Sequence, residues 1–321
     1  MMSQHHIRTV YFCSAGFQVL AAAASASASA GHHILFVIDH ERMRSVVASL
    51  RACFDQVVWL QGKMRSVRRG IVRWAAPLLR VLLDPCAHRP DRLCLGAYDA
   101  PGEALARLLR PRAVVLLDDG AATITVARER HAGNCRRFPR GAHFETIFHA
   151  LTFGAKDTVS ALPLDGLRRR VPASTKAPVR VDTVFIGSKI DASQLSLDGY
   201  MACVSEALRR YGRLGYLPHP REMTSLEAVR RCADVEILQP SGSFETMVLS
   251  GQLAASRVVG VQSTALFSAL LLGWTREQIV ALIPHETSWT HHPCDFQDVE
   301  RLARLNLTVV ELEPMDACGP A

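Results

Sequence analysis

Two adjacent carboxylates, Asp118 and Asp119, directly follow an apolar run at residues 113–117 and precede Gly120. The run predicts a buried strand, so both carboxylates would emerge at its carboxyl end, where the glycine lets the chain turn sharply. Neighbouring carboxylates raise each other's pKa, which suits one of them to act as a general base. The same pattern also fits an acidic turn that ends a strand, with aspartate capping the next helix.

A second candidate is His219, which stands between Pro218 and Pro220 and is followed by Arg221. The two prolines hold the histidine in an extended loop after a short predicted strand. An imidazole in that position could donate a proton to a leaving phosphate, and Arg221 would add a fixed positive charge. The alternative is an ordinary loop histidine, one of thirteen in the chain.

Two further turns offer small or hydroxyl side chains after predicted strands. Gly187 and Ser188 would let a ligand approach the backbone closely, and Asp191 follows them. Ser263 and Thr264 open an apolar helix, where hydroxyls and free backbone N–H groups can cradle a phosphate. The first turn also fits a plain strand-to-helix connection, and the second also fits ordinary N-capping.

The elements that must position these residues alternate between short apolar runs and helical patterns, which predicts an α/β fold with parallel sheets. The predicted strands are residues 9–13, 34–38, 56–60, 92–95 and 113–117, then 183–186, 215–217, 235–238, 257–261 and 278–283. The predicted helices are residues 17–30, 41–52, 64–82 and 102–110, then 192–211, 224–231, 244–250, 264–273 and 296–304.

These two series predict two Rossmann-like domains, residues 1–170 and 180–321, that face a central cleft. A basic, proline-containing stretch at 163–179 predicts a linker between them. In such sheets ligands bind outside the carboxyl ends of the strands, and all four motifs stand there. We therefore expect loops of both domains to converge on one site.

Composition narrows the class of protein. The chain has 321 residues, 49% of them hydrophobic and 21% charged, which is globular and not disordered. Its nine cysteines are scattered without a C-x-x-C pair, which predicts reduced, mostly buried thiols inside the cell. The first thirty residues fit a signal peptide on pattern alone, but we favour a strand at 9–13 followed by an alanine-rich helix.

The net charge of +7 favours anionic partners. Basic residues interleaved with apolar ones at 63–80 predict either an amphipathic helix on an anionic membrane or an ordinary domain helix with a solvated face. A second basic cluster could line a groove for a polyanionic glycan or form a solvated loop. Its residues are Arg128, Arg130, Arg136, Arg137 and Arg140.

Taken in order along the chain, the motifs resemble glycosyltransferase family 52, the bacterial lipooligosaccharide sialyltransferases, and the related capsular polysialyltransferases. A family D/E-D/E-G motif is matched by Asp118-Asp119-Gly120, an H-P motif by His219-Pro220, and an S-S/T motif by Ser263-Thr264. The strand ending in Gly187-Ser188 resembles the opening of the family's second half. The first strand runs into a loop and helix bearing Gln18, which is also similar to the family.

This resemblance implies a GT-B fold, a CMP-sialic acid donor, and inversion at the anomeric carbon without a metal or other cofactor. It implies that Asp119, or its neighbour Asp118, is the base and that His219 is the acid. Ser263 and Thr264 would hold the phosphate, and Gly187 and Ser188 would lie against the nucleotide. The other substrate-binding residues expected on this basis are Gln18, Gly120, Pro220 and Arg221.

The chain departs from the family in one place. In some lipooligosaccharide members the base is an aspartate just after the Gly-Ser turn, whereas Lys189 and Ile190 follow Ser188 here and the acid comes later, at Asp191. The base is therefore Asp119 or Asp191, and we favour Asp119.

We expect a cytoplasmic enzyme, with possible peripheral contact at the inner face of the cytoplasmic membrane, that transfers sialic acid to a lipooligosaccharide or capsule acceptor. A related GT-B transferase using CMP-Kdo or a UDP-sugar is the alternative within enzymes. A catalytically silent, basic surface-binding module is the alternative from another class. Nucleic acid is disfavoured, because aromatic residues make up only 7% and no RNP-like or helix-turn-helix pattern occurs.

Overall fold

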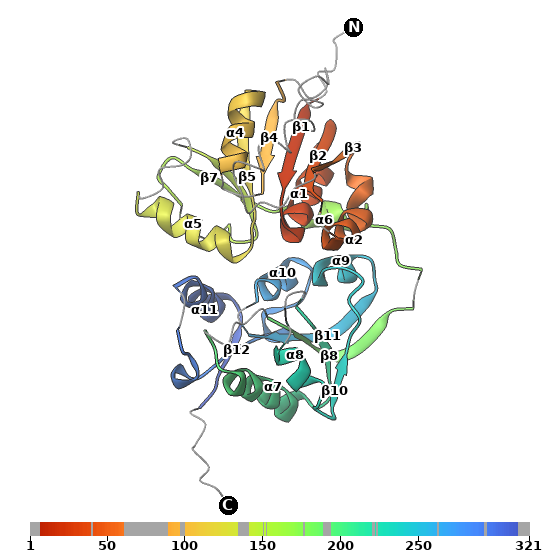
Figure 1. Cartoon of the computed structure of the whole chain (residues 1–321), viewed down its shortest axis with the longest axis vertical. Helices are drawn as coiled ribbons and strands as arrows, with labels where there is room; N and C mark the ends of the chain where they lie inside the picture. The colour runs from red at the N-terminus through yellow and green to blue at the C-terminus, as the bar shows by residue number, and fades with distance from the viewer. Residues whose placement is uncertain are drawn as a thin grey trace, which may run out of the picture. The chain divides into compact units, whose positions relative to one another are not determined.

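The computed structural model of the chain describes residues 7–39, 41–60, 89–96, 100–133, 141–149, 151, 153–175, 177–188, 194–219, 222, 224–261, 263–291 and 294–313. It divides into two compact units, Met1–Pro172 and Ala173–Ala321 (Figure 1). Asp191, Pro220, Arg221, the predicted helix at 64–82 and the basic residues Arg136, Arg137 and Arg140 lie outside the described residues.

The N-terminal unit is built on a seven-stranded sheet in the order β3-β2-β1-β4-β5-β6-β7, with every neighbouring pair parallel. Its strands are β1 (Arg8–Cys13), β2 (His32–Ile38), β3 (Gln56–Leu60), β4 (Arg92–Leu95), β5 (Ala113–Leu117), β6 (His143–Thr146) and β7 (Thr158–Ala161). Its described helices are α1 (Gly16–Ala28), α2 (Glu41–Leu50), α4 (Ala100–Leu109), α5 (Ala121–His131) and α6 (Leu164–Arg168), with a 3-10 turn at Arg51–Cys53.

The strand and alanine-rich helix predicted at the N-terminus are confirmed. β1 lies inside the sheet between β2 and β4, and the alanines of α1 from Ala21 to Ala24 are fully buried. Small side chains let this helix approach its neighbours closely. α6 packs against α1, and a Cβ at Gly166 would lie 3.3 Å from the carbonyl oxygen of Ser27. The prediction of a linker over 163–179 is therefore wrong for residues 164–168, which form this helix with Leu164 and Leu167 buried.

The C-terminal unit has a six-stranded parallel sheet in the order β10-β9-β8-β11-β12-β13. Its strands are β8 (Val179–Ile186), β9 (Leu214–Leu217), β10 (Val235–Ile237), β11 (Leu253–Gly260), β12 (Ile279–Ile283) and β13 (Thr308–Glu311). Its helices are α7 (Leu197–Tyr211), α8 (Thr224–Val229), α9 (Phe244–Leu249), α10 (Ala265–Leu271) and α11 (Cys294–Asn306), with 3-10 turns at Arg276–Gln278 and Glu286–Ser288.

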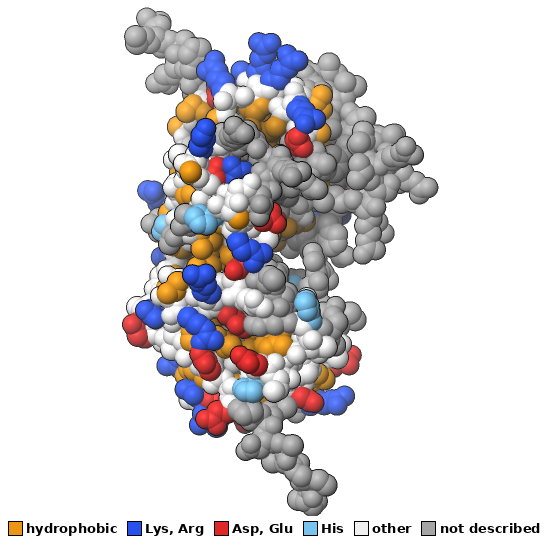
Figure 2. All heavy atoms as spheres, turned by 90° about the vertical axis from the view of Figure 1, so that its left-hand side faces the viewer, with side chains coloured by type: hydrophobic (Ala, Val, Ile, Leu, Met, Phe, Trp, Pro, Cys, Tyr) orange, Lys and Arg blue, Asp and Glu red, His pale blue; other side chains and the backbone are white. Residues whose placement is uncertain are grey.

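Each sheet carries its own hydrophobic core. One core includes Phe12, Phe36 and Phe144, and the other includes Phe185, Tyr200 and Tyr216. The five cysteines that the structure describes with their surroundings are free, as the sequence predicted, and four of them are buried. Figure 2 shows charged side chains of both signs spread over the face that it presents. Within the described ranges, no helix combines the length and hydrophobicity needed to cross a membrane.

Candidate functional site

The two carboxylates after β5 have different surroundings. Asp118 is fully buried and accepts four hydrogen bonds. Its Oδ1 accepts from the Gly120 N–H (2.7 Å) and from Thr123 Oγ1 (3.0 Å). Its Oδ2 accepts from the Ile147 N–H (2.7 Å) and from the hydroxyl of Thr146. Asp118 therefore fastens the loop after β5 to the end of β6 and to the start of α5.

Burial raises the pKa of Asp118 to about 6, although the four donors favour its ionised form and oppose that rise. Gly120 completes the turn with a positive φ of 67°, a conformation that glycine adopts without steric cost. The side chain of Asp119, which stands between Asp118 and this glycine, contacts Gln18 of α1 instead of the partners of the Asp118 carboxylate.

Asp119 is half-buried and contacts α1. Its Oδ1 accepts a hydrogen bond from Gln18 Nε2 at 2.6 Å, and its backbone N–H donates to Thr123 Oγ1 at 2.8 Å. The carboxyl ends of β1 and β5 thus bring together two residues that are 101 positions apart. Gln18, which the family resemblance suggested as a substrate-binding residue, lies beside the candidate base.

The amide of Gln18 has a fixed orientation. Its Oε1 accepts from the N–H of Ser14 (2.6 Å), the hydroxyl of Ser14 (3.1 Å) and the N–H of Ala15 (3.1 Å). With the oxygen held by the β1–α1 loop, the NH₂ group must point at Asp119. Gly96, just after β4, makes room for this side chain, because a Cβ there would lie 2.6 Å from Gln18 Oε1.

In the C-terminal unit, Gly187 and Ser188 follow β8 as predicted and touch two other strand ends. The Gly187 N–H donates to the carbonyl of Leu217 (2.8 Å), at the end of β9. The Ser188 hydroxyl donates to the carbonyl of Val261, just after β11. Ser188 is buried, so its hydroxyl acts here as a tie between loops.

A buried network of hydrogen-bonded side chains, which the sequence did not reveal, contacts this turn. Tyr216 OH donates to Glu222 Oε1, and Tyr200 OH and Tyr216 OH are 2.6 Å apart. Burial raises the pKa of both tyrosines, so they stay protonated. Because the proton of Tyr216 goes to Glu222, Tyr200 is the donor in the bond between the two phenols. The Ser188 N–H completes the network by donating to Tyr200 OH at 3.4 Å.

Glu222 connects this hydrogen-bond network to the loop that carries His219. Its Oε2 accepts from the His219 N–H at 3.0 Å, and its Oε1 also accepts from Ser225 Oγ at 2.6 Å. The Glu222 N–H in turn donates to the His219 carbonyl at 2.9 Å. A Cβ at Gly187 would lie 2.3 Å from Glu222 Oε2 and 2.9 Å from the His219 nitrogen. The Gly-Ser turn and the H-P loop are therefore held together by one buried carboxylate.

Ser263 and Thr264 stand before α10, also as predicted. Ser263 Oγ accepts from the Ala265 N–H at 3.3 Å, which is a capping contact. Thr264 is half-buried, and no hydrogen bond from its side chain caps the helix. This turn, the Gly-Ser turn and the H-P loop follow β11, β8 and β9, which are neighbours in the sheet. The structure thus brings three of the predicted motifs to one edge.

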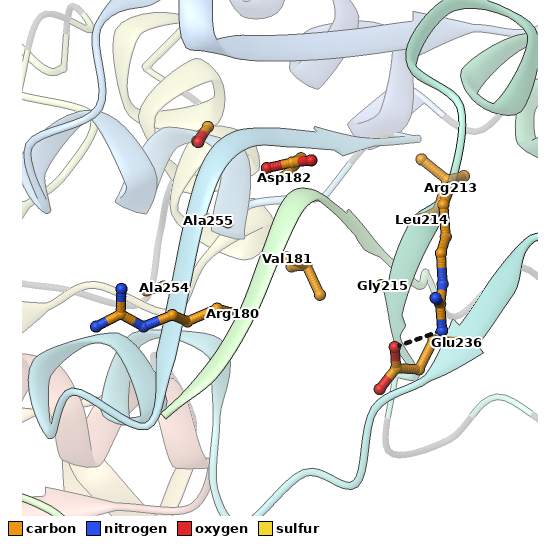
Figure 3. A pocket seen from close by; sticks show the side chains of 10 residues that line it. Arg180, Val181, Asp182, Arg213, Leu214, Gly215, Glu236, Ala254 and Ala255 are labelled. Carbon is orange, nitrogen blue, oxygen red and sulfur yellow. Dashed lines mark hydrogen bonds and ion pairs between the residues drawn. The ribbon is translucent and has the colours of Figure 1, made fainter. Parts of the chain in front are cut away.

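A hollow of about 480 Å³ opens at the opposite edge of the same sheet (Figure 3). It is lined by early residues of β8, β9, β10 and β11, among them Arg180, Asp182 and Arg213. Arg213 and Glu236 form an exposed ion pair on its rim, 3.1 Å apart. None of the predicted site residues lines it.

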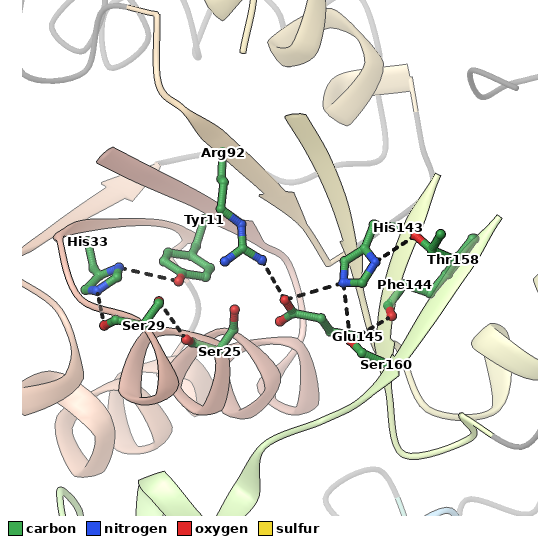
Figure 4. Close-up of polar contacts among 10 residues, drawn as sticks. All are labelled: Tyr11, Ser25, Ser29, His33, Arg92, His143, Phe144, Glu145, Thr158 and Ser160. Atoms are coloured by element: carbon green, nitrogen blue, oxygen red, sulfur yellow. Dashed lines mark hydrogen bonds and ion pairs between the residues drawn. The ribbon is translucent and has the colours of Figure 1, made fainter. Parts of the chain in front are cut away.

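A separate polar cluster lies between the N-terminal sheet and α1 (Figure 4). Arg92 Nη2 donates to Glu145 Oε1 at 2.6 Å, which ties β4 to β6 across β5. Ser160 Oγ lies 3.2 Å from His143 Nε2, and Thr158 Oγ1 lies 2.9 Å from His143 Nδ1, so β7 joins the same cluster. These contacts fix the strands that carry Asp118 and its partners.

Comparison with known proteins identifies the fold. No family model matches the chain, and no curated protein matches it. Among solved structures, a 2,6-sialyltransferase from Photobacterium sp., in complex with CMP and lactose, is 12% identical with a TM-score of 0.52, covering 94% of this chain and 78% of its own. The spinosyn forosaminyltransferase SpnP is 15% identical with a TM-score of 0.54, covering 97% of this chain and 87% of its own.

A putative UDP-N-acetylglucosamine 2-epimerase from Listeria monocytogenes is similar as well, at 9% identity and a TM-score of 0.55, with 94% of this chain and 88% of the other covered. The chain therefore has the GT-B fold, as the sequence predicted. Because an epimerase also has this fold, the fold alone does not identify the reaction of this chain, which has to be argued from the site itself.

Proposed function

We propose that the chain is an inverting glycosyltransferase that moves sialic acid from CMP-sialic acid to the hydroxyl of a glycan acceptor. One observation carries the proposal: the two adjacent carboxylates have different surroundings, which suit them to separate roles. Asp118 is fully buried and committed to four donors, whereas Asp119 is half-buried and oriented by Gln18. A carboxylate held in this way at the carboxyl end of a strand suits a general base.

In the proposed reaction, the acceptor oxygen attacks the anomeric carbon of the donor, and the bond from that carbon to the CMP phosphate oxygen breaks. Asp119 takes the proton that the acceptor hydroxyl loses. His219 donates a proton to the departing phosphate, and Ser263 and Thr264 stabilise its charge. The transfer exchanges one C–O bond for another and needs no redox partner, and we propose that it needs no metal.

We prefer Asp119 to Asp191 as the base because Gln18 of α1 donates to its carboxylate and Thr123 of α5 accepts from its backbone N–H, which holds it in place at the end of β5. Gly187 and Ser188 are proposed to lie against the nucleotide, and Glu222 to hold the His219 loop beside them. The family 52 assignment rests on the motif order alone and forms part of this proposal.

Three alternatives are weighed against this reaction: another donor, an epimerase reaction and a silent binding module. A transferase using CMP-Kdo or a UDP-sugar would place another donor against the same loops. An epimerase reaction, which the similar GT-B structure from Listeria monocytogenes suggests, would need no acceptor hydroxyl. A silent binding module would turn over none of these donors.

The test incubates the purified full-length chain with CMP-sialic acid, CMP-Kdo and a panel of UDP-sugars, with and without galactosides and oligosialic acids. We expect CMP release from CMP-sialic acid that an acceptor accelerates at least tenfold, with a sialylated product of inverted anomeric configuration. Turnover of a UDP-sugar or CMP-Kdo alone would replace the donor assignment. Absence of turnover with every donor would overturn the enzyme proposal.

A further inference from the structure

The starts of β1, β4 and β5 lie side by side at the amino-terminal edge of the N-terminal sheet. The Asp91 N–H donates to the carbonyl of Arg8 (2.9 Å), and the Ala113 N–H donates to the carbonyl of Asp91 (3.0 Å). The last turn of α4 returns to the same edge, because α4 connects the carboxyl end of β4 to the start of β5. Within this unit, the edge is opposite to the one that carries Asp119.

This edge is basic. Arg92, the first residue of β4, pairs with Glu145 inside the polar cluster of Figure 4. The other described arginines at the edge are Arg8, Arg89, Arg107, Arg110 and Arg112, beside the acid Asp91 and, one turn back along α4 from Arg107, Glu103. Asp91 pairs with Arg112 (3.2 Å), and Glu103 pairs with Arg107. Arg89 and Arg110 are exposed and have no ion-pair partner among the described residues. We call the surface formed by these five arginines with Ile7 and Leu108 the basic edge.

Arg89 and Arg110 also hold unusual backbone conformations. Their φ angles are 52° and 46°, and no other described non-glycine residue has a positive φ. Each arginine precedes a proline, Pro90 or Pro111, at the start of a strand. Glycine or asparagine suits such a backbone better than arginine does. Two charged side chains at strained positions of one edge therefore point to a function of the edge.

The basic edge includes exposed hydrophobic side chains between its charges. Leu108 at the end of α4 is 52% exposed, and Ile7 before β1 is 45% exposed. They are two of five large hydrophobic residues that are exposed in the described part of the chain. Figure 2 shows basic side chains gathered at the upper end of the face that it presents, over the N-terminal unit, with hydrophobic ones between them.

We propose that the basic edge docks the protein on an anionic lipid bilayer. Arginines near such a surface are attracted by the lipid phosphates, and apolar side chains among them can enter the headgroup region. A nucleic acid would use the arginines but offers no comparable environment for Leu108. The carboxyl edge of the same sheet would stay open to substrate. The proposal goes beyond the proposed transfer reaction and holds for any donor.

The test is co-sedimentation of the full-length chain with vesicles of phosphatidylglycerol and phosphatidylcholine in equal parts, and with phosphatidylcholine alone, at 0.1 M salt. The double variant Arg89→Asn/Arg110→Asn removes two charges and places asparagine, which tolerates a positive φ, at both positions. We expect its partition coefficient on anionic vesicles to fall about twenty-five-fold, at roughly fivefold per arginine. Its melting temperature should be unchanged or higher, so a folding defect would not explain the loss.

The matched control is Arg230→Asn/Arg231→Asn, which removes the same charge from two exposed arginines after α8 in the C-terminal unit. Its binding should stay within twofold of the parent chain. Leu108→Ala should weaken binding severalfold without any change in charge. Equal losses in both double variants, equal binding to neutral vesicles, or absence of binding would overturn the proposal. Binding to a DNA duplex that exceeds vesicle binding and ignores Leu108→Ala would also overturn it.

Discussion

At the scale of single residues, the division between Asp118 and Asp119 makes opposite predictions for two neighbouring substitutions. Asp119→Asn removes the proposed base while its contact with Gln18 Nε2 can persist, since the amide oxygen still accepts. We expect turnover to fall at least about a hundredfold, the usual scale for acid–base groups. The unfolding free energy should change by less than about 1 kcal/mol, because the side chain is only half-buried.

Asp118→Asn should instead destabilise the fold. An NH₂ group in place of one carboxylate oxygen would face backbone or hydroxyl donors, leaving buried groups unsatisfied at a cost of about 2–3 kcal/mol. Turnover, measured well below the melting temperature, should fall less than in Asp119→Asn. Denaturant melts and initial rates of both variants check the pair. A stable, inactive Asp118→Asn beside an active Asp119→Asn would reverse the assignment.

The raised pKa of Asp118 also predicts how stability depends on pH. Its ordinary value of 3.8 applies to the unfolded chain, and its folded value is about 6. Folding therefore favours the protonated carboxyl, and that stability is fully present below pH 4 and is lost as pH rises through 6. A rise of about two pH units corresponds to about 3 kcal/mol.

The contribution of Asp118 is isolated by comparing the parent chain with Asp118→Asn in urea melts at pH 4.5 and pH 7. The stability difference between the two proteins should be larger at pH 4.5 than at pH 7. A difference that does not vary over this range would show that the carboxyl of Asp118 is ionised throughout in the folded chain.

At the scale of elements, most strands and helices were predictable because their apolar runs are long and buried. The predictions at 9–13, 34–38 and 113–117, for example, agree with β1, β2 and β5 within two residues. The short strands β6 (HFET), β7 (TVSA) and β13 (TVVE) were missed, since polar residues interrupt their apolar pattern. The helix α5 was missed as well, because it has almost no amphipathic periodicity.

Those missed elements explain what the sequence could not say about the site. Asp118 is the buried aspartate because it accepts hydrogen bonds from Thr146 and Ile147. These two residues stand at the end of β6, a strand that the sequence did not predict. The link from Tyr200 through Tyr216 to Glu222 depends on how β8, β9 and α7 pack, which spacing along the chain does not reveal. Glu222 stands three residues after His219, but in sequence it is only one charged residue of a loop.

The contact between the Gly-Ser turn and the H-P loop predicts the outcome of Gly187→Ala. A Cβ at 2.3 Å from Glu222 Oε2 and 3.0 Å from Tyr216 OH would displace the carboxylate from the His219 N–H. We expect a loss of about 2–3 kcal/mol in unfolding free energy and a KM for the donor raised at least fivefold. Thermal melts and initial rates measure both effects.

Gly16→Ala is the matched control for this substitution. A Cβ at Gly16, the first residue of α1, would meet only Val46 Cγ2 at 3.5 Å, which is an ordinary contact. Its stability should be unchanged or higher, because alanine favours the helix. If Gly187→Ala behaves like Gly16→Ala, the Gly187 turn does not position the histidine loop.

At the scale of the whole molecule, each unit has its own sheet and core, so the C-terminal unit should fold by itself. Its first residues are anchored within the unit. The Ser174 N–H donates to the carbonyl of Ser250 (2.8 Å), and the Val179 N–H donates to the carbonyl of Gln252 (2.8 Å). A fragment comprising residues 172–321 should therefore unfold cooperatively in a thermal melt followed by circular dichroism.

That fragment separates donor binding from transfer. It keeps Gly187, His219 and Ser263, so calorimetry should show CMP binding within about tenfold of the full chain, weakened by His219→Ala. It lacks Asp119, and with it the proposed base, so it should form no sialylated product at any acceptor concentration. A folded fragment that fails to bind CMP, when the full chain binds it, would mean that the N-terminal unit contributes most of the nucleotide contacts. A fragment that still transfers sialic acid would exclude Asp119 and leave Asp191 as the base.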